Sequence, residues 1–203
     1  MKEKNINYLY SYEVDDQFFL EDIENRRIFL YDDISSETID HVVYHVLRYN
    51  RLDKDIPIDE RKTIILYINS PGGSVTDGFA IIDCLLLSKT PIYTVNIATC
   101  YSMGFLIFLA GSKRFALPSS TYLCHDGGNF AYDSTAKLKD RMEFELGAME
   151  EHTKEYVISR TNISSDLYDV NYRKEWYFYP DEAKKYGVVT DIVGIDCDIN
   201  SII

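Results

Sequence analysis

The stretch TCYSMGFLIFLAG, residues 99–111, places the hydroxyl group of Ser102 directly before an uninterrupted apolar run. A serine at this point is typical of a helix N-cap, because its side chain accepts a hydrogen bond from the first free N–H groups. The same position also suits a nucleophile, since a helix N-terminus favours developing negative charge. The window alone favours the cap, and the rest of the chain decides between the two interpretations.

Length and composition limit the kind of protein. With 203 residues and 46% apolar side chains, the chain has the size of one domain and enough apolar material for a core. The formal net charge of −12 argues against a nucleic-acid partner, which requires a basic surface. The sequence therefore predicts a globular domain that does not bind nucleic acid.

The chain shows no targeting or membrane signal. Residues 1–16 have no apolar stretch and no small-residue cleavage site, and no window reaches the ~18 apolar residues that a membrane span needs. Neither CxxC nor metal-ligand spacing is found among the cysteines, which favours reduced thiols at Cys84, Cys100, Cys124 and Cys197. We expect a cytoplasmic protein that does not associate with membranes.

Apolar strands and amphipathic helices alternate along the chain. Strands are expected at residues 27–31, 63–69, 91–98, 113–118 and 120–125, and helices at 35–50, 75–89, 102–111 and 134–160. A charged connector is expected at 51–62, and a short helix ending at Gly187 precedes a final strand. This alternation predicts an α/β domain with parallel strands.

A glycine turn, SPGG at residues 70–73, follows the second apolar strand. Two successive glycines let a backbone N–H approach a substrate carbonyl without an intervening Cβ atom. The turn could thus supply one donor of an oxyanion hole, although an ordinary tight turn has the same sequence.

His125 ends the apolar strand TYLC. Ligands commonly bind at the carboxyl ends of parallel strands, so a histidine there is a candidate site residue. A packed structural histidine is the competing interpretation, and neither Ser102 nor His125 decides the function by itself.

The chain resembles the proteolytic subunit of the Clp protease in three segments taken in order, YINSPGGSVTDGFAIIDCL, ATCYSMGFLIFLAGSKRFALPSS and TYLCHDG. That family carries an NSPGG turn after a strand, a nucleophile in an SMG motif and a histidine at the end of a strand. The resemblance covers about residues 20–193. It implies a crotonase-like α/β fold of stacked ββα units, with a protruding handle helix at about 134–160. Residues 20–203 would form one peptidase domain, preceded by a divergent segment at 1–19.

The resemblance also implies a mechanism and partners. Ser102 would be the nucleophile and His125 the general base, while the N–H groups of Gly73 and Met103 would form the oxyanion hole. Unfolded polypeptides would be cut inside a chamber of two stacked heptameric rings, a tetradecamer of this chain, and an AAA+ unfoldase ATPase would feed it. The peptidase itself would need no cofactor and no metal.

The sequence departs from the family at the third triad position. Asn171 stands where the family usually has an aspartate, and Asp169 is the alternative acid if the loop is repositioned. An asparagine oxygen can fix the tautomer of the histidine but stabilises the imidazolium only weakly. Val170 replaces an arginine that often helps to lock the two rings together.

Three alternatives to an active serine endopeptidase stay open, and the departures at Asn171 and Val170 favour the first of them. A catalytically weak or inactive ring subunit that assembles with an active paralogue is the first. The others are an acyl-CoA hydratase or thioesterase on the same fold, which leaves the serine unexplained, and a Ser–Lys peptidase. The last would need a catalytic lysine, for which Lys89 and Lys113 are the nearest candidates.

Overall fold

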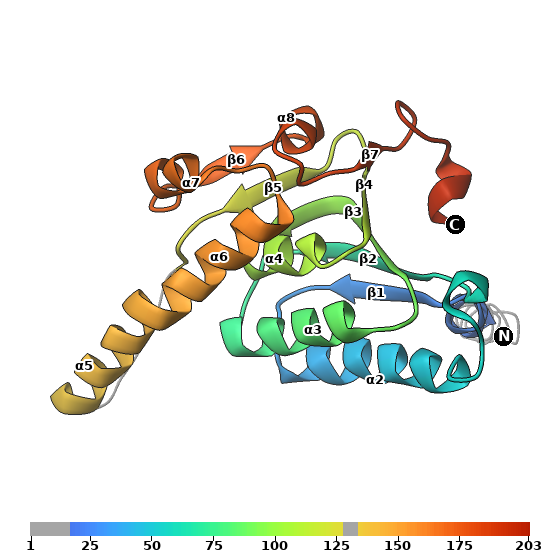
Figure 1. Cartoon of the computed structure of the whole chain (residues 1–203), viewed down its shortest axis with the longest axis horizontal. Coiled ribbons are helices and arrows are strands. Elements are labelled where there is room, and N and C mark those ends of the chain that lie inside the picture. The colour runs from blue at the N-terminus through green and yellow to red at the C-terminus, as the bar shows by residue number, and fades with distance from the viewer. Residues whose placement is uncertain (1–16, 128–133) are drawn as a thin grey trace, which may run out of the picture.

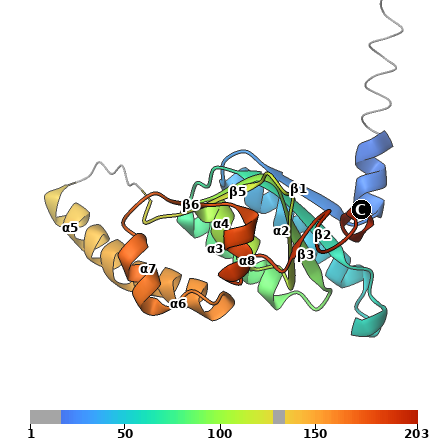
Figure 2. The same ribbon diagram turned by 90° about the horizontal axis from the view of Figure 1, so that it is seen from above.

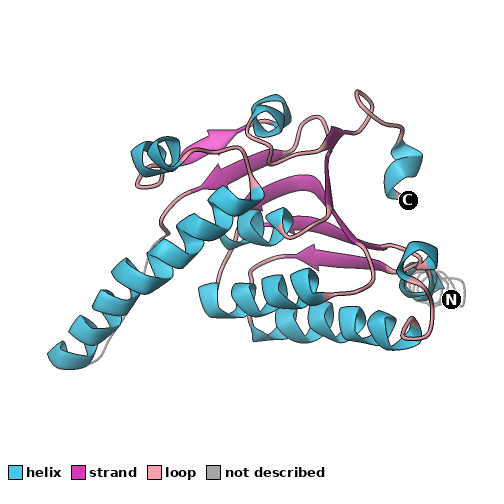
Figure 3. Ribbon diagram, viewed as in Figure 1, coloured by secondary structure: helices cyan, strands magenta, loops and turns pink. Residues whose placement is uncertain are grey.

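The computed structural model describes residues 17–127 and 134–203 of the chain. This part contains a sheet flanked by helices (Figures 1 and 3). In chain order the strands are β1 (Arg27–Tyr31), β2 (Ile64–Ser70), β3 (Ile92–Tyr101), β4 (Lys113–Ala116), β5 (Thr121–Cys124), β6 (Trp176–Phe178) and β7 (Asp191–Ile192). The predicted strands are all present, with small differences at their ends.

The sheet is parallel over most of its width. β1 pairs with β2, β2 with β3, and β3 with β4, all in parallel, and β4 pairs with β7. The sequence of β2, IILYINS, is apolar without alternation, which is typical of a strand covered on both faces. The predicted α/β domain with parallel strands is confirmed.

Strand β3 is long enough to pair with both β4 and β5 along different parts of its length. Its residues 93–96 pair with β4, and its residues 99–101 pair with β5. β6 pairs with β5 in antiparallel orientation, so that β5 and β6 form a two-stranded ribbon. Because β3 and β5 are parallel, Ser102 after β3 and His125 after β5 lie at the same edge.

Helices cover the sheet and pack on one another. Besides the handle, they are α2 (Ser36–Leu52), α3 (Val75–Leu87), α4 (Met103–Leu109), α7 (Ser165–Asn171) and α8 (Pro180–Lys185), with 3₁₀ turns η1 (Ile58–Glu60) and η3 (Ile199–Ile202). α2 and α3 lie side by side along the β1 side of the sheet (Figure 1). α4 packs on α3 and β3, and all of its residues are buried.

The handle is one long helical arm. It consists of α5 (Thr135–Phe144), a π-helical turn η2 (Glu145–Met149) and α6 (Glu150–Arg160), and it projects beyond the sheet (Figures 1 and 2). The helix predicted at 134–160 is therefore confirmed. Large apolar side chains remain exposed on it, among them Met142, Phe144 and Leu146.

Apolar side chains gather on both faces of the sheet. The larger cluster lies under the helices and includes the fully buried Ile68, Phe108 and Val157. A smaller aromatic cluster around Tyr67 is covered by η3, where the Tyr67 hydroxyl donates to the Ile202 carbonyl. The chain is thus packed on each side of β2 and β3.

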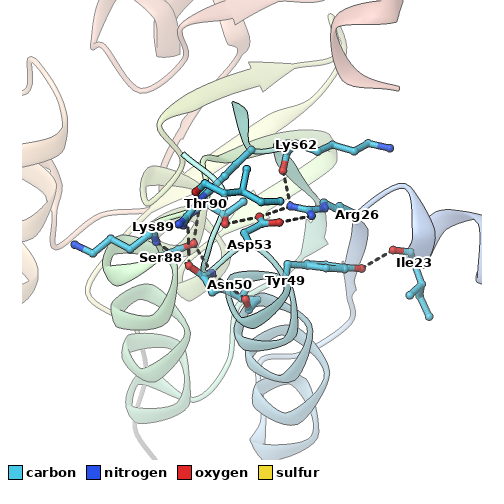
Figure 4. A network of polar contacts seen from close by, with 12 residues as sticks. Ile23, Arg26, Tyr49, Asn50, Asp53, Lys62, Ser88, Lys89 and Thr90 are labelled. Atoms are coloured by element: carbon cyan, nitrogen blue, oxygen red, sulfur yellow. Dashed lines mark hydrogen bonds and ion pairs between the residues drawn. The ribbon is translucent and has the colours of Figure 1, made fainter. Parts of the chain in front are cut away.

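A buried ion pair ties the start of β1 to the end of α2 (Figure 4). The guanidinium of Arg26 contacts both carboxylate oxygens of Asp53, and Thr90 Oγ1 donates to Asp53 Oδ2 at 2.7 Å. The Asp53 side chain is 0% exposed. This residue belongs to the segment predicted as a charged connector, so the network was not visible in the sequence pattern.

Three elements differ from the expectation. α7 and β6 were not predicted, and neither was the helix at residues 17–24, which runs across the expected boundary between the divergent segment at 1–19 and the peptidase domain. The rest of the segment at 1–19 lies outside the described residues.

Candidate active site

The turn at Ser102 joins β3 directly to α4. Its backbone has φ +52° and ψ −121°, a region that non-glycine residues seldom occupy. The Ser102 N–H donates to the Leu123 carbonyl at 2.9 Å, and the Ser102 carbonyl accepts from Phe105 N at 3.0 Å. Although Ser102 stands at the N-cap position, its side chain makes no capping hydrogen bond with any described residue. A strained strand-to-helix turn that presents a free hydroxyl is the geometry of a nucleophile elbow.

The glycine turn approaches the backbone of Ile34. Ile34 N donates to Gly72 O at 2.7 Å and Ser74 N donates to Ile34 O at 2.9 Å, which places Gly73 opposite Ile34 in a parallel bridge. A Cβ atom on Gly73, whose φ is +144°, would lie 2.4 Å from the Ile34 oxygen. Since those two bonds use the residues flanking Gly73, its own N–H is free of the bridge.

Gly72 brings the turn against the elbow. A Cβ atom on Gly72 would lie 2.7 Å from Ser102 Cβ and 3.1 Å from Met103 N. Met103 begins α4, so its N–H is among the amides that lack a partner within the helix. Its side chain is 2% exposed and lies over Gly78 of α3, where any Cβ atom would clash. The two predicted donors, Gly73 and Met103, therefore belong to closely packed backbone.

His125 follows β5, and its side chain is 19% exposed. Its Nδ1 atom is 2.9 Å from Glu175 Oε1. When a carboxylate accepts a hydrogen bond from Nδ1, the other ring nitrogen is left free to act as a base.

A cleft of about 620 Å³ contains the predicted groups together. Gly73, Ser102, Met103 and His125 all line it, on the side where β3 and β5 end. The π-helical turn of the handle lines the opposite side, through Leu146 and Met149. Hydroxyl, imidazole and free amides in one cleft form a set suited to acyl transfer.

Residues 13–196 match the sequence model of a family described as Clp protease. The chain belongs to the Clp protease family. The match covers most of the chain, as the resemblance over about residues 20–193 predicted, and it makes the protein a Clp protease-like peptidase.

Individual Clp proteins support the assignment. The chain is 27% identical over 190 residues to the ATP-dependent Clp protease proteolytic subunit 2 of Treponema pallidum, which covers 90% of this chain and 89% of the relative. A solved structure of an asparagine-to-aspartate mutant of ClpP1 from Listeria monocytogenes matches with a TM-score of 0.77 and 22% identity. The match covers 92% of this chain and 99% of the other. The predicted Clp-type crotonase-like fold is thus confirmed.

Glu175 is the site residue that sequence reasoning missed. It directly precedes β6, whose antiparallel pairing with β5 joins Cys124 to Trp176. Its Oε2 atom accepts a hydrogen bond from the Tyr177 hydroxyl at 3.2 Å. The hydrogen bond from His125 lowers the pKa of the Glu175 carboxyl below its usual value, so the group is ionised at neutral pH. Its only sequence signal is a carboxylate before the aromatic run WYF.

The two residues predicted for the third triad position bond elsewhere. Asn171 Nδ2 donates to the Leu167 carbonyl one helical turn earlier at 2.9 Å, and Asp169 pairs with Lys154 at 2.8 Å. Both lie on α7, which directs these contacts along its own axis and toward α6. In this structure the residue bonded to His125 Nδ1 is Glu175 instead.

Two thiols lie close to the site in sequence. Burial raises the pKa of the Cys124 thiol to about 12, and it also raises the pKa of Cys100. A protonated, buried thiol is a poor nucleophile, which leaves Ser102 as the group suited to that role.

Charged side chains frame the cleft in pairs. Arg173 contacts Glu150 of the handle at 3.0 Å and Asp126 at 3.7 Å.

Within residues 17–127 and 134–203, no group of three or more His, Cys, Asp and Glu side chains is placed to hold a metal ion. No helix in those ranges is both long and apolar enough to cross a membrane.

Proposed function

We propose that the protein is a Clp-type serine endopeptidase that cleaves unfolded polypeptides, with Ser102 as nucleophile and His125 as general base. The observation that carries the proposal is the strained elbow, which holds a free Ser102 hydroxyl in the cleft that His125 also lines. Backbone strain of this kind persists where function requires it.

The chemistry follows from these groups. Ser102 Oγ attacks the scissile carbonyl carbon while His125 accepts the hydroxyl proton, and the oxygen that becomes negative receives hydrogen bonds from Gly73 and Met103. His125 then gives the proton to the leaving amine. Water, activated by the same histidine, hydrolyses the acyl-enzyme and frees Ser102. No cofactor is needed for these steps.

We further propose that the chain works as a homo-oligomer of two stacked heptameric rings in the cytoplasm, supplied with substrate by an AAA+ unfoldase. Family membership supports a ring assembly. The exposed apolar side chains Met142 and Leu146 line one groove on the projecting handle, and a contiguous apolar patch marks an interaction surface, which supports a further contact between subunits.

An inactive ring subunit is the second candidate. Asn171 in place of the usual aspartate, and the exposed Val170 in place of an arginine, favour it. Such a subunit would assemble with an active paralogue and would not need a working nucleophile.

Labelling with a fluorophosphonate probe separates the two candidates. We expect the purified chain to gain one adduct per subunit, located on Ser102 by mass spectrometry, and to hydrolyse a short peptide. The S102A variant is the matched control and should show neither. A chain that never labels, alone or mixed with a paralogue, is the inactive subunit.

A further inference from the structure

We propose that Glu175 is the carboxylate that positions His125 for catalysis, an inference that rests on the proposed peptidase function. It assigns the third position to the β6 ribbon instead of to residue 171 on α7. Glu175 touches the histidine and not the substrate, so it is a positioning residue.

The ribbon register places the two side chains together. Tyr122 pairs with Phe178, and Cys124 pairs with Trp176, so the next pair in the same antiparallel register is His125 with Glu175. Directly opposed residues of such a pair project from the same face and lie within reach of each other. The backbone pairing, which ends at Cys124 and Trp176, therefore brings the two side chains to within the 2.9 Å contact between Nδ1 and Oε1.

Both oxygens of Glu175 are engaged. Oε1 meets His125 Nδ1, and Oε2 accepts from the Tyr177 hydroxyl, which lies on the same face two residues along β6. The Tyr177 ring in turn packs edge-on against Tyr101 of β3, with centroids 5.5 Å apart. A carboxylate held at both oxygens has a defined orientation toward the histidine.

The negative charge of Glu175 can stabilise the imidazolium of His125, which the neutral side chain of an asparagine does only weakly. A partner of Nδ1 has to fix the tautomer that leaves Nε2 free, and it has to stabilise the imidazolium formed during attack. An amide oxygen does the first, and an ionised carboxylate does both. The other nearby carboxylates are occupied, Asp169 by Lys154 and Asp126 by Arg173.

A purely structural role does not explain the pair. The Glu175 side chain is 60% exposed, and exposed ion pairs contribute little to stability because water screens them. Removing the charge should thus leave folding intact and alter the chemical step.

The test compares E175Q with the wild type in the assembled full-length protein. E182Q is the matched control, since Glu182 is also exposed and also accepts a hydrogen bond from a tyrosine, Tyr186, but lies on α8. Peptide hydrolysis gives kcat and KM separately, the probe gives the labelling rate at Ser102, and thermal unfolding and size exclusion report folding and assembly.

We expect E175Q to lower kcat about 10²- to 10⁴-fold and to slow labelling, with KM changed less than about twofold and an unchanged melting temperature. E182Q should match the wild type in all readouts. N171A, which removes the competing candidate, should lower kcat less than E175Q does.

Three results overturn the proposal. E175Q with wild-type kcat removes Glu175 from the mechanism and leaves the peptidase function standing. N171A with the larger loss of kcat assigns the role to residue 171. A wild type that never labels at Ser102 overturns the peptidase function, and this inference fails with it.

Discussion

Two carboxylates in this molecule each form a hydrogen bond with a nitrogen-containing side chain, one in the buried interior and one at the surface. Asp53 is fully buried, and both of its oxygens meet the guanidinium of Arg26 (Figure 4). Glu175 is 60% exposed and bonds His125, which lines the cleft. Both carboxyl groups have a lowered pKa, in each case because the bonded partner favours the ionised form.

Because the Asp53 pair is buried and the Glu175 pair is exposed, loss of the first should lower stability, whereas loss of the second should alter activity. A charge without its partner in the interior is strongly unfavourable, so the Asp53 pair cannot be broken without loss of stability. At the surface, water replaces a lost partner, so the Glu175 pair can be altered with little effect on folding. The same contact is therefore structural at one place and available for chemistry at the other.

The largest effect is expected for D53A. The substitution leaves the largely buried Arg26 side chain, which is 13% exposed, without its carboxylate partner and should lower the free energy of unfolding by about 3–5 kcal/mol in urea denaturation. D55A is the control, because Asp55 is 85% exposed, and its change should stay within about 0.5 kcal/mol. Equal stability of the two variants would mean that the buried Asp53 pair stabilises the fold no more than an exposed carboxylate does.

T90V tests how much a single hydrogen bond to the buried Asp53 carboxylate contributes to stability. Thr90 is 1% exposed, and its hydroxyl donates to Asp53 Oδ2 at 2.7 Å. The substitution keeps the shape but removes a hydrogen bond to a buried charge, so urea denaturation should show a loss of about 1.5–3 kcal/mol. A variant as stable as the wild type would mean that Arg26 alone satisfies the carboxylate.

Acid should reveal the Asp53 pair through the pH dependence of stability. The folded-state pKa of Asp53 lies below its usual value of 3.8, so its contribution is complete above about pH 4 and is lost as the pH falls through the folded-state pKa. The unfolding free energy of the wild type should therefore fall below pH 4, by at most about 1.4 kcal/mol per pH unit for this proton. In D53N this part of the slope should be missing, and an unchanged slope would assign acid sensitivity to other carboxylates.

Y177F should give the smallest effect, and only on activity. The variant removes the hydroxyl that holds Glu175 Oε2 but leaves the contact with His125 in place. Peptide hydrolysis should show kcat reduced about two- to fivefold with the melting temperature unchanged. If Y177F equals the wild type while E175Q is impaired, the tyrosine has no share in orienting the carboxylate.

Local sequence signals were sufficient to predict the Ser102 side of the candidate site. The apolar run after Ser102 predicts a buried helix, the two glycines predict a turn, and β2 and β3 read as buried strands. Each of these depends on a few consecutive residues. The positions of Ser102 and His125 at neighbouring strand ends follow from parallel pairing, which the alternation of elements predicts.

Contacts between segments that are far apart in the sequence could not be predicted from such local signals. β6 has three residues, and Glu175 meets His125 only because β6 pairs with a strand 50 residues earlier. Asp53 reads as part of a charged connector until Arg26, 27 residues away, is placed beside it. The positive φ of Ser102 arises from the backbone around it and leaves no mark in the sequence.

The positive φ of Ser102 lowers the stability of the fold at a position where the proposed chemistry requires a serine. Such a conformation costs a serine on the order of 1–3 kcal/mol, whereas a glycine adopts it freely. The variant S102G should therefore unfold at a higher urea concentration than S102A, although neither can form an acyl-enzyme. A chain released from the need to cut peptides would become more stable with glycine at this position, so the stability difference between S102G and S102A measures what the strained turn costs the fold.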